Sequence, residues 1–231
     1  MIAFCQSNDT KNIVTVKKGH LYDIEFENKI INSESGILAI DDIIFNHTVY
    51  DKTIFALHGA AVEYNGKAYL FLASTTSGKT TLTSYLTSNG FGYITDDCIL
   101  LDRKTFEVYP YNTPIHLRDG GVEVLKRFNA LPSQLEILDD GYIKRYIYTP
   151  KNSVDKSLPV EKIFFINRTE KDNILEDLDT TSRMSSLMHA PITVYTITPE
   201  YLKFISSLSK TNCCKLCYCD MDFVAEVIRN G

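Results

Sequence analysis

The sequence predicts an α/β fold in which a phosphate-binding loop joins a strand to a helix, within a mixed sheet with flanking helices. Two observations carry this prediction. Residues 73–80 (ASTTSGKT) follow the apolar run 69–72 and precede Leu82, Tyr85 and Leu86 at helical spacing. A strand, a tight loop and a helix in this order are the context in which backbone N–H groups at a helix N-terminus bind phosphate.

Composition and charge place the chain among ordinary globular proteins. Of its 231 residues, 44% are hydrophobic and 23% are charged, which is enough for one substantial core. The net charge is −5 and no run of basic residues exceeds Lys17-Lys18, so we expect no binding to nucleic acid or to a membrane. There is no N-terminal signal-type segment and no apolar run of spanning length, so we expect a cytoplasmic protein.

The first 50 residues show strand-like alternation and no visible chemistry. Apolar and polar side chains alternate over residues 21–26, which predicts strands. We expect residues 1–50 to form a β-rich segment or small lobe, and residues 51–231 to form the domain that carries the loop. His20 and His47 stand alone, and we expect them to be solvated or at the edge of a core.

A hairpin is predicted directly before the loop. Asn65-Gly66 lies between two strand-like segments and is a strong signal for a two-residue turn. In the register that this turn sets, residue 64 faces residue 67 and His58 faces Ala73, the first residue of the loop. We therefore expect His58 beside the phosphate site; a histidine merely satisfied within a hairpin is the alternative.

The loop itself carries the most specific signal. Lys79 is expected to reach the outer phosphates of ATP, and the Thr80 hydroxyl to bind Mg²⁺. Ala73 replaces the first glycine of the consensus pattern, so the chain should enter the loop with a less contorted backbone. A polar turn that only caps a helix is the alternative. The expected nucleotide-binding residues are Ala73, Ser74, Thr75, Thr76, Ser77, Gly78, Lys79, Thr80 and Thr81.

Two adjacent aspartates follow the next predicted strand. Residues 91–95 (FGYIT) end in Asp96 and Asp97. If this strand lies beside the loop strand and parallel to it, both carboxylates face the phosphates, where one can hold Mg²⁺ and the other can take a proton. Solvated turn residues are the alternative.

Further along, one arginine and one polar region have functional interpretations. Arg118 precedes a glycine-rich turn and could contact the γ-phosphate, with a surface ion pair as the alternative.

Residues 129–160 are polar and proline-containing, so we expect an irregular substrate-recognition excursion. Its aromatic and basic residues suit a groove for an extended peptide, with core packing as the alternative: Tyr142, Lys144, Arg145, Tyr146 and Tyr148.

The C-terminal third predicts strands and capped helices. Residues 162–166 (KIFFI) read as a buried strand, and Thr198 followed by Pro199 predicts the start of a helix. Residues 213–219 (CCKLCYC) alternate like a strand, before a helix capped by Asp220 or Asp222. We expect reduced thiols there; a zinc site is the alternative, although four ligands on one extended segment cannot converge on one ion.

The motif set resembles the catalytic domain of HPr kinase/phosphorylase, a family related to phosphoenolpyruvate carboxykinases. The resemblance rests on four features at the family's spacing: residues 57–59 (LHG), the loop 73–80, Gly90, and the pair Asp96-Asp97. It implies an HPr kinase-like core with ATP and Mg²⁺ as cofactors. It also implies that His58 contacts the acidic pair, with Asp96 as general base toward a seryl hydroxyl and Asp97 as a metal ligand.

The departures from the family affect the substrate. The downstream motifs with which HPr kinases recognise HPr and run phosphorolysis are not found, and the short chain is closer to stand-alone kinases of peptide-modifying clusters, such as those of lasso-peptide precursors. We therefore expect a kinase of a peptide or protein hydroxyl, in which an imidazolium at His58 tunes the base. A kinase of a small-molecule hydroxyl, a nucleotide-hydrolysing switch and a non-catalytic nucleotide-binding scaffold remain alternatives, as does a homo-oligomer.

Overall fold

A computed structural model describes residues 53–74, 76–139, 144–192 and 197–231 together with the backbone of four strands in residues 2–33. Predictions that concern Thr75, Tyr142, His20 and His47 fall outside the described residues. The chain divides into two units, Met1–Ile54 and Phe55–Gly231, and each is described by itself.

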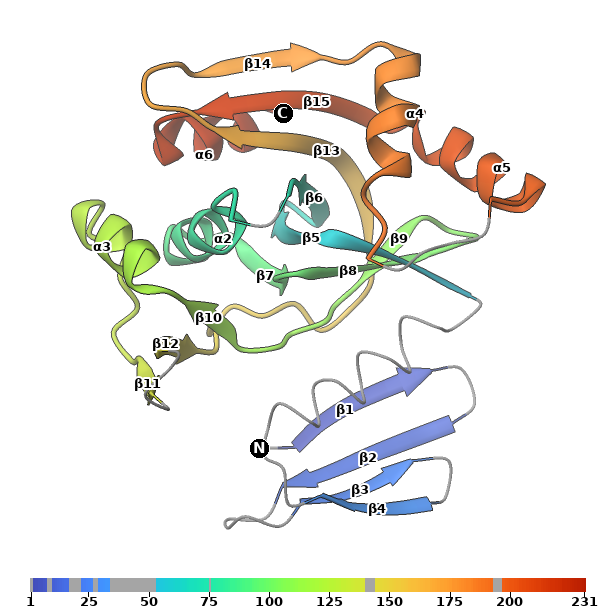
Figure 1. Ribbon diagram of the computed structural model, residues 1–231, viewed down its shortest axis with the longest axis vertical. Coiled ribbons are helices and arrows are strands. Elements are labelled where there is room, and N and C mark those ends of the chain that lie inside the picture. Colours follow the sequence, from blue (N-terminus) through green and yellow to red (C-terminus); the bar gives the residue numbers. More distant parts are fainter. Residues whose placement is uncertain are drawn as a thin grey trace. The chain divides into compact units, whose positions relative to one another are not determined.

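The first unit contains an antiparallel sheet of four strands that follow one another in chain order (Figure 1). Successive strands pair with their neighbours in sequence, as the alternating pattern of residues 21–26 predicts. The strands are β1 (Ile2–Ser7), β2 (Thr10–Val16), β3 (Tyr22–Phe26) and β4 (Lys29–Ser33).

The second unit is built on an eight-stranded mixed sheet. Its order is β14-β15-β13-β6-β5-β8-β9, and β7 also pairs with β5. The strand β6 that leads into the loop is parallel to β13 and antiparallel to β5. The bounds are β5 (Ile54–Tyr64), β6 (Lys67–Leu72), β7 (Gly92–Thr95), β8 (Cys98–Asp102), β9 (Glu107–Tyr109), β13 (Leu158–Arg168), β14 (Ile174–Asp177) and β15 (Asn212–Tyr218).

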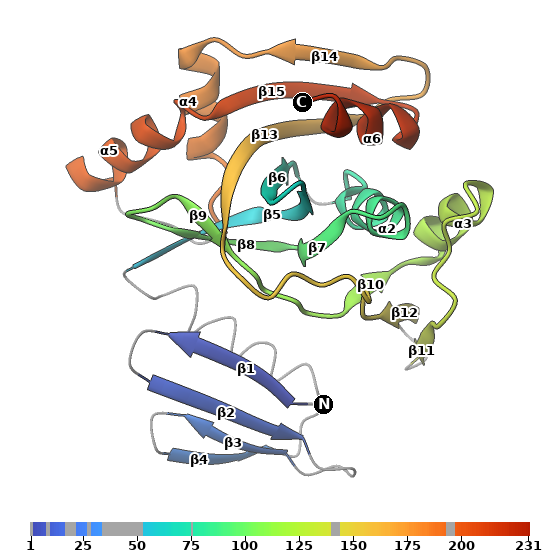
Figure 2. The same cartoon turned by 180° about the vertical axis from the view of Figure 1, so that it is seen from behind.

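Helices cover both faces of this sheet (Figures 1 and 2). One core contains side chains of α2 (Lys79–Ser88), α3 (Asp119–Arg127) and α6 (Met221–Arg229). The other core contains side chains of α4 (Thr180–Met188) and α5 (Pro199–Leu208). The predicted fold class, an α/β protein with a loop-bearing mixed sheet and flanking helices, is confirmed.

A second sheet has three strands, and two of them lie in the segment 129–160 that was predicted to be irregular. Its order is β10-β12-β11, with bounds β10 (Ile115–Leu117), β11 (Glu136–Asp139) and β12 (Lys144–Tyr148). The prediction was wrong here because short strands with many charged side chains lack the alternation that marks a buried strand. Tyr146 and Tyr148 pack against the hydrophobic core, which is the alternative that the sequence left open.

The C-terminal strand and the helix caps agree with the sequence pattern. Thr198 accepts a hydrogen bond from the Tyr201 N–H at the start of α5, and Asp220 caps α6. On β15, Cys213 packs into one core, whereas Cys214, Leu216 and Tyr218 pack into the other. Because alternate residues of the strand face opposite sides, the cysteines do not converge, and no cluster of three or more metal-ligating side chains occurs in the part of the chain that the structure describes.

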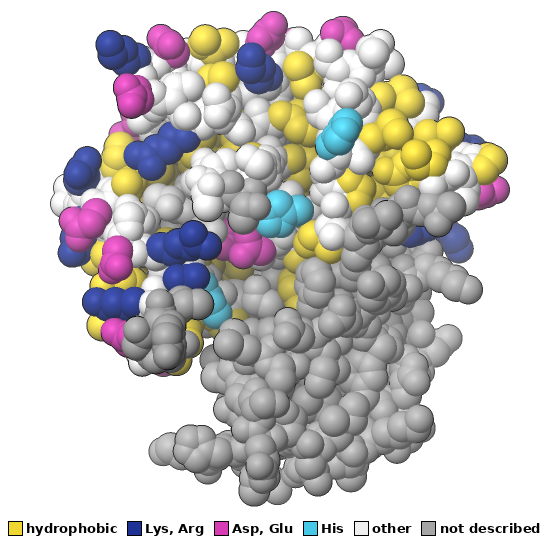
Figure 3. Space-filling view, viewed as in Figure 1, with side chains coloured by type: hydrophobic (Ala, Val, Ile, Leu, Met, Phe, Trp, Pro, Cys, Tyr) yellow, Lys and Arg dark blue, Asp and Glu magenta, His cyan; other side chains and the backbone are white. Residues whose placement is uncertain are grey.

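The described surface is mixed in character. Figure 3 shows hydrophobic side chains gathered over α5, where Ile197 and Leu202 are exposed. Two outer strands, β11 and β14, also expose pairs of large apolar residues. None of the helices described is long and apolar enough to cross a membrane.

Candidate nucleotide site

The hairpin before the loop has the predicted register. Gly59 pairs with Leu72 and Tyr64 with Lys67, and both turn residues have positive φ, 52° for Asn65 and 76° for Gly66. Two successive left-handed residues make the type I′ turn, whose twist matches that of the strands. One step beyond the Gly59 and Leu72 pair, this register brings His58 to the first residue of the loop.

The loop carries its strained conformations after its entry. Thr76 and Gly78 have positive φ, 65° and 93°, whereas Ala73 does not, so alanine is accommodated where the consensus has glycine. Gly78 is the N-cap of α2. The first turn of α2 thus presents its unpaired backbone N–H groups at the carboxyl end of β6, as an anion-binding helix terminus requires.

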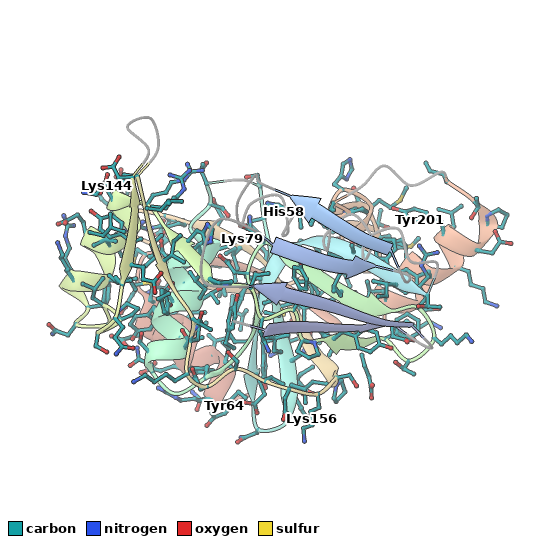
Figure 4. The ribbon with its side chains drawn as sticks, turned by 90° about the horizontal axis from the view of Figure 1, so that it is seen from below. His58, Tyr64, Lys79, Lys144, Lys156 and Tyr201 are labelled. Atoms are coloured by element: carbon teal, nitrogen blue, oxygen red, sulfur yellow. The ribbon has the colours of Figure 1, made fainter. Side chains whose placement is uncertain are left out.

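Lys79 lies at the mouth of the loop. Its ammonium donates hydrogen bonds to the Ala73 and Ser74 carbonyl oxygens, both at 3.0 Å, and lies 3.2 Å from His58 Nε2. Figure 4 shows His58 and Lys79 next to each other, with Tyr64 at the far end of the hairpin. The lysine is mostly buried, and burial lowers its pKa, which the charges of Asp97 and Asp96 oppose.

The surroundings of His58 disfavour the charged form of its ring. Burial and the neighbouring Lys79 lower its pKa, against the opposing influence of Asp97. Desolvation and the cation thus act against the imidazolium that the sequence predicted, and the carboxylate acts in its favour. Since an ammonium can only donate, His58 Nε2 accepts from Lys79 and the ring proton is on Nδ1.

The strand before the two aspartates lies in a different place from the predicted one. β7 pairs with β5, whereas the sequence pattern assumed a neighbour parallel to β6. Since β5 is antiparallel to both β6 and β7, the carboxyl ends of β6 and β7 still open at the same edge. The Gly59 N–H donates to the Asp97 carbonyl oxygen at 3.3 Å, which fixes the aspartates next to the histidine.

The two carboxylates have opposite environments. Asp96 is only 7% exposed and its Oδ1 has no hydrogen-bond partner in the described part of the chain. Burial and the charge of Asp97 raise its pKa to about 7, against the effects of the Thr80 hydroxyl and Lys79. Asp97 is exposed and holds a positive φ of 69°. A buried acid without a full set of partners is typical of a functional site rather than of a stable core.

This raised pKa predicts how stability depends on pH. The folded chain keeps a proton on Asp96 that the unfolded chain, with an ordinary pKa of 3.8, releases at lower pH. The contribution of Asp96 is therefore fully present below about pH 4 and is lost as pH rises through about 7. Without added metal, the free energy of unfolding of Asp96→Asn relative to the parent should rise by roughly 2 kcal/mol between about pH 5 and about pH 8.

Urea unfolding of both proteins at the two pH values measures this difference. Glu107→Gln is a suitable control, because Glu107 is a partly exposed carboxylate bonded to Ser157, away from the loop. An Asp96→Asn difference that does not change with pH would show that the carboxyl is already ionised in the folded chain.

Gly59 holds the histidine and the aspartate together. A Cβ placed on Gly59 would lie 2.6 Å from the Phe71 carbonyl oxygen and 2.7 Å from side-chain atoms of Leu72 and Ile99. No side chain fits at this position without moving backbone. We expect Gly59→Ala to destabilise the fold by about 2 kcal/mol and to displace His58, its neighbour in the chain.

Gly120→Ala is the matched control for this prediction. Gly120 is helical, has no positive φ, and would have no other group within 4 Å of an added Cβ, so alanine should be neutral or stabilising there. Chemical denaturation of the two variants gives the comparison. Equal midpoints would contradict the role of Gly59.

Arg118 is at the start of α3, next to the loop helix. It is exposed and serves as the N-cap of α3, with no side-chain capping bond. The first turn of α3 packs against that of α2, since a Cβ on Gly121 would lie 3.0 Å from Thr81 Oγ1. Arg118 makes no ion pair with the described residues, so the alternative of a surface ion pair finds no support there.

Two site residues escaped the sequence analysis, Arg168 and Tyr218. They end β13 and β15, the two parallel strands on the other side of β6, and both lie close to Gly78. The carboxyl ends of parallel strands were the usable signal, but the strand order was needed to place them beside the loop.

Comparison with known proteins leaves the family of this chain open. No family model and no curated protein sequence matches it. Among solved structures, the chain is similar to the HPr(Ser) kinase/phosphatase from Coxiella burnetii, with 16% identity and a TM-score of 0.40 over 76% of this chain and 94% of that one. A likeness at this level carries no information about activity.

Proposed function

We propose that the protein is a Mg²⁺- and ATP-dependent kinase that transfers the γ-phosphate to a hydroxyl group. The observation that carries this proposal is the buried Asp96 carboxyl group, which interacts with Thr80 and Lys79 and has one oxygen atom without a partner among the described residues. A phosphate-binding loop needs a carboxylate for the metal and a second group for the acceptor. Asp96 and Asp97, which are neighbours in the chain, can supply these two groups.

Asp96 and Thr80 fit a magnesium site. Mg²⁺ is usually held in proteins by one or two oxygen ligands together with substrate phosphates and water, and the unpartnered Asp96 Oδ1 is available for this role. When bound, the ion would neutralise charge on the outer phosphates. Binding would also remove the cost of ionising a buried acid, because the cation favours the charged form of Asp96.

Asp97 and His58 fit the acceptor side. Asp97 is exposed, so an incoming hydroxyl can reach it, and the His58 ring lies beside Lys79 and is influenced by the charge of Asp97. We assign the general base to Asp97 and the metal to Asp96. This reverses the roles that the family resemblance implies, because Asp96 is the buried partner of Thr80.

We propose a peptide or protein hydroxyl as the acceptor. β11 pairs within the described residues only with β12, and it exposes Ile137 and Leu138. An outer strand of this kind can receive an extended peptide as an added strand. Because Tyr146 and Tyr148 pack against the core, the outer strand replaces the tyrosine groove as the support for this acceptor.

An acceptor panel tests the proposal. The protein is incubated with γ-labelled ATP and Mg²⁺, together with serine-containing peptides encoded beside its gene, HPr, free serine, or sugars. Label on a peptide or protein is the expected result. Label on a small molecule alone would overturn the acceptor class, and release of labelled phosphate without any labelled acceptor would favour a nucleotide-hydrolysing switch.

A further inference from the structure

Arg168 ends β13, the strand that runs beside the strand leading into the phosphate-binding loop. β13 runs parallel to β6, and its Phe165 pairs with Leu72, the last residue of β6. β13 continues for three more residues to Arg168, while the chain after Leu72 turns into the loop. The end of β13 thus flanks the loop, as does the end of β15, whose Tyr218 pairs with Arg168.

The side chains of Arg168 and Tyr218 lie against the start of the loop helix α2. A Cβ on Gly78 would lie 3.3 Å from Tyr218 Oη and 3.8 Å from Arg168 Cδ. The aliphatic part of Arg168 therefore lies along the N-cap of α2, where backbone N–H groups and the helix dipole favour an anion. The second sign of a ligand at this helix start is the buried Asp96, which is hydrogen-bonded to Thr80 in the first turn of α2 and whose Oδ1 has no partner among the described residues.

Arg168 is held by its backbone, while its guanidinium has no partner among the described residues. The Thr169 N–H donates to the Tyr218 carbonyl oxygen at 2.8 Å, and Asn173 Oδ1 accepts from the Cys219 N–H at 2.9 Å. These bonds fix the turn that follows β13 to the end of β15. Across the described ranges, the exposed Arg168 side chain has no hydrogen bond or ion pair, so its charge is available to a ligand.

The sheet order decides which part of a nucleotide Arg168 faces. β5 and β13 lie on opposite sides of β6. On the β5 side, Lys79 contacts His58 beside the aspartates, so the outer phosphates and the acceptor belong there. The β13 side is left for the inner phosphate and the nucleoside.

We propose that Arg168 binds the phosphate groups of the nucleotide that are not transferred. The inference rests on the proposed function, because it assumes that the loop holds a nucleotide triphosphate. The guanidinium has five N–H donors in a planar fork, which suits two oxygens of one phosphate. The Tyr218 hydroxyl, beside the same glycine, can donate a further hydrogen bond.

Calorimetric titration of Arg168→Gln with ATP and with ADP, both with Mg²⁺, tests the inference. Both ligands contain the phosphate groups that are not transferred, so Kd should rise by about 10- to 100-fold for each, while kcat at saturating ATP changes less than about 3-fold. Arg168→Lys should recover part of the affinity, because it keeps the charge but loses the fork. Lys171→Gln, in the same exposed turn, is the matched control and should bind like the parent.

The outcomes separate this inference from the proposed function. A parent protein that binds neither nucleotide overturns both. A parent that binds ATP, together with an Arg168→Gln variant of unchanged affinity, overturns the role of Arg168 alone. Loss of ATP affinity with ADP affinity retained would place Arg168 at the γ-phosphate instead. A lower melting temperature of nucleotide-free Arg168→Gln, with no rescue of binding by Arg168→Lys, would make its role structural.

Discussion

Lys79→Ala is expected to lower the affinity for ATP by roughly 100-fold and to abolish detectable phosphate transfer. The Lys79 ammonium is bonded to loop carbonyls and lies beside His58, within the loop that is proposed to hold the phosphates. Calorimetric titration with ATP and Mg²⁺ measures the loss. In the free protein Lys79 also donates hydrogen bonds to the Ala73 and Ser74 carbonyl oxygens, so its removal changes the free form as well. The stability of each variant should therefore be measured both with and without ATP.

Lys67→Ala is the matched control for this prediction. Lys67 begins β6, at the end of the hairpin away from the loop, and pairs with Glu161 at 2.7 Å across an exposed surface. Its removal should leave the affinity for ATP unchanged, since surface pairs contribute little. Equal ATP affinities for Lys79→Ala and Lys67→Ala would contradict the assignment of the loop as a phosphate site.

Asp97→Asn is expected to slow transfer by roughly 10³- to 10⁴-fold and to leave the affinity for Mg²⁺ and ATP within a few-fold of the parent. The amide removes the proton acceptor but keeps the shape of an exposed residue at positive φ, which asparagine tolerates. Single-turnover transfer from labelled ATP measures the rate, and titration with Mg²⁺ measures the metal.

Asp96→Asn should show the opposite pattern. Its affinity for ATP should lose its dependence on Mg²⁺, because the buried carboxylate beside Thr80 is the proposed metal ligand. If Asp96→Asn kept its Mg²⁺ dependence while Asp97→Asn lost it, the two roles would have to be exchanged. The base would then be the buried acid, as the family resemblance implies.

Local sequence signals were sufficient for the elements that meet at the loop. The Asn65-Gly66 turn determines the register of the hairpin through two left-handed residues, and this register places His58 without knowledge of the rest of the fold. The strand, loop and helix around Lys79 follow from spacing alone. These features depend on residues close together in the chain, where propensity and periodicity are informative.

Strand order could not be read in the same way. The position of β7 beside β5 and of β13 beside β6 depends on pairings between distant segments, and no local pattern encodes them. β7 does not lie beside β6, as the sequence analysis assumed. Asp96 and Asp97 still follow a strand that ends at the same edge as β6, because β5 lies between the two strands and is antiparallel to both. No local pattern in the sequence places Arg168 near the loop, so its position beside Gly78 is known only from the structure.

The pKa shifts of the site residues could not be predicted from the sequence either. The charges of His58 and Asp96 depend on burial and on the distance to Lys79. Burial acts in opposite directions on an imidazole and on a carboxyl, since it favours the neutral form of each. At this site burial therefore lowers the pKa of His58 and raises that of Asp96.

The most direct test of the central claim follows the γ-phosphate in a single turnover. The parent protein and Asp97→Asn are each mixed with γ-labelled ATP, Mg²⁺ and the acceptor peptide, and label is measured on the peptide and in free phosphate. We expect ADP and labelled peptide to form in equal amounts with the parent, and Asp97→Asn to bind ATP but leave the peptide unlabelled. Label found only in free phosphate, in equal amounts for both proteins, would contradict it.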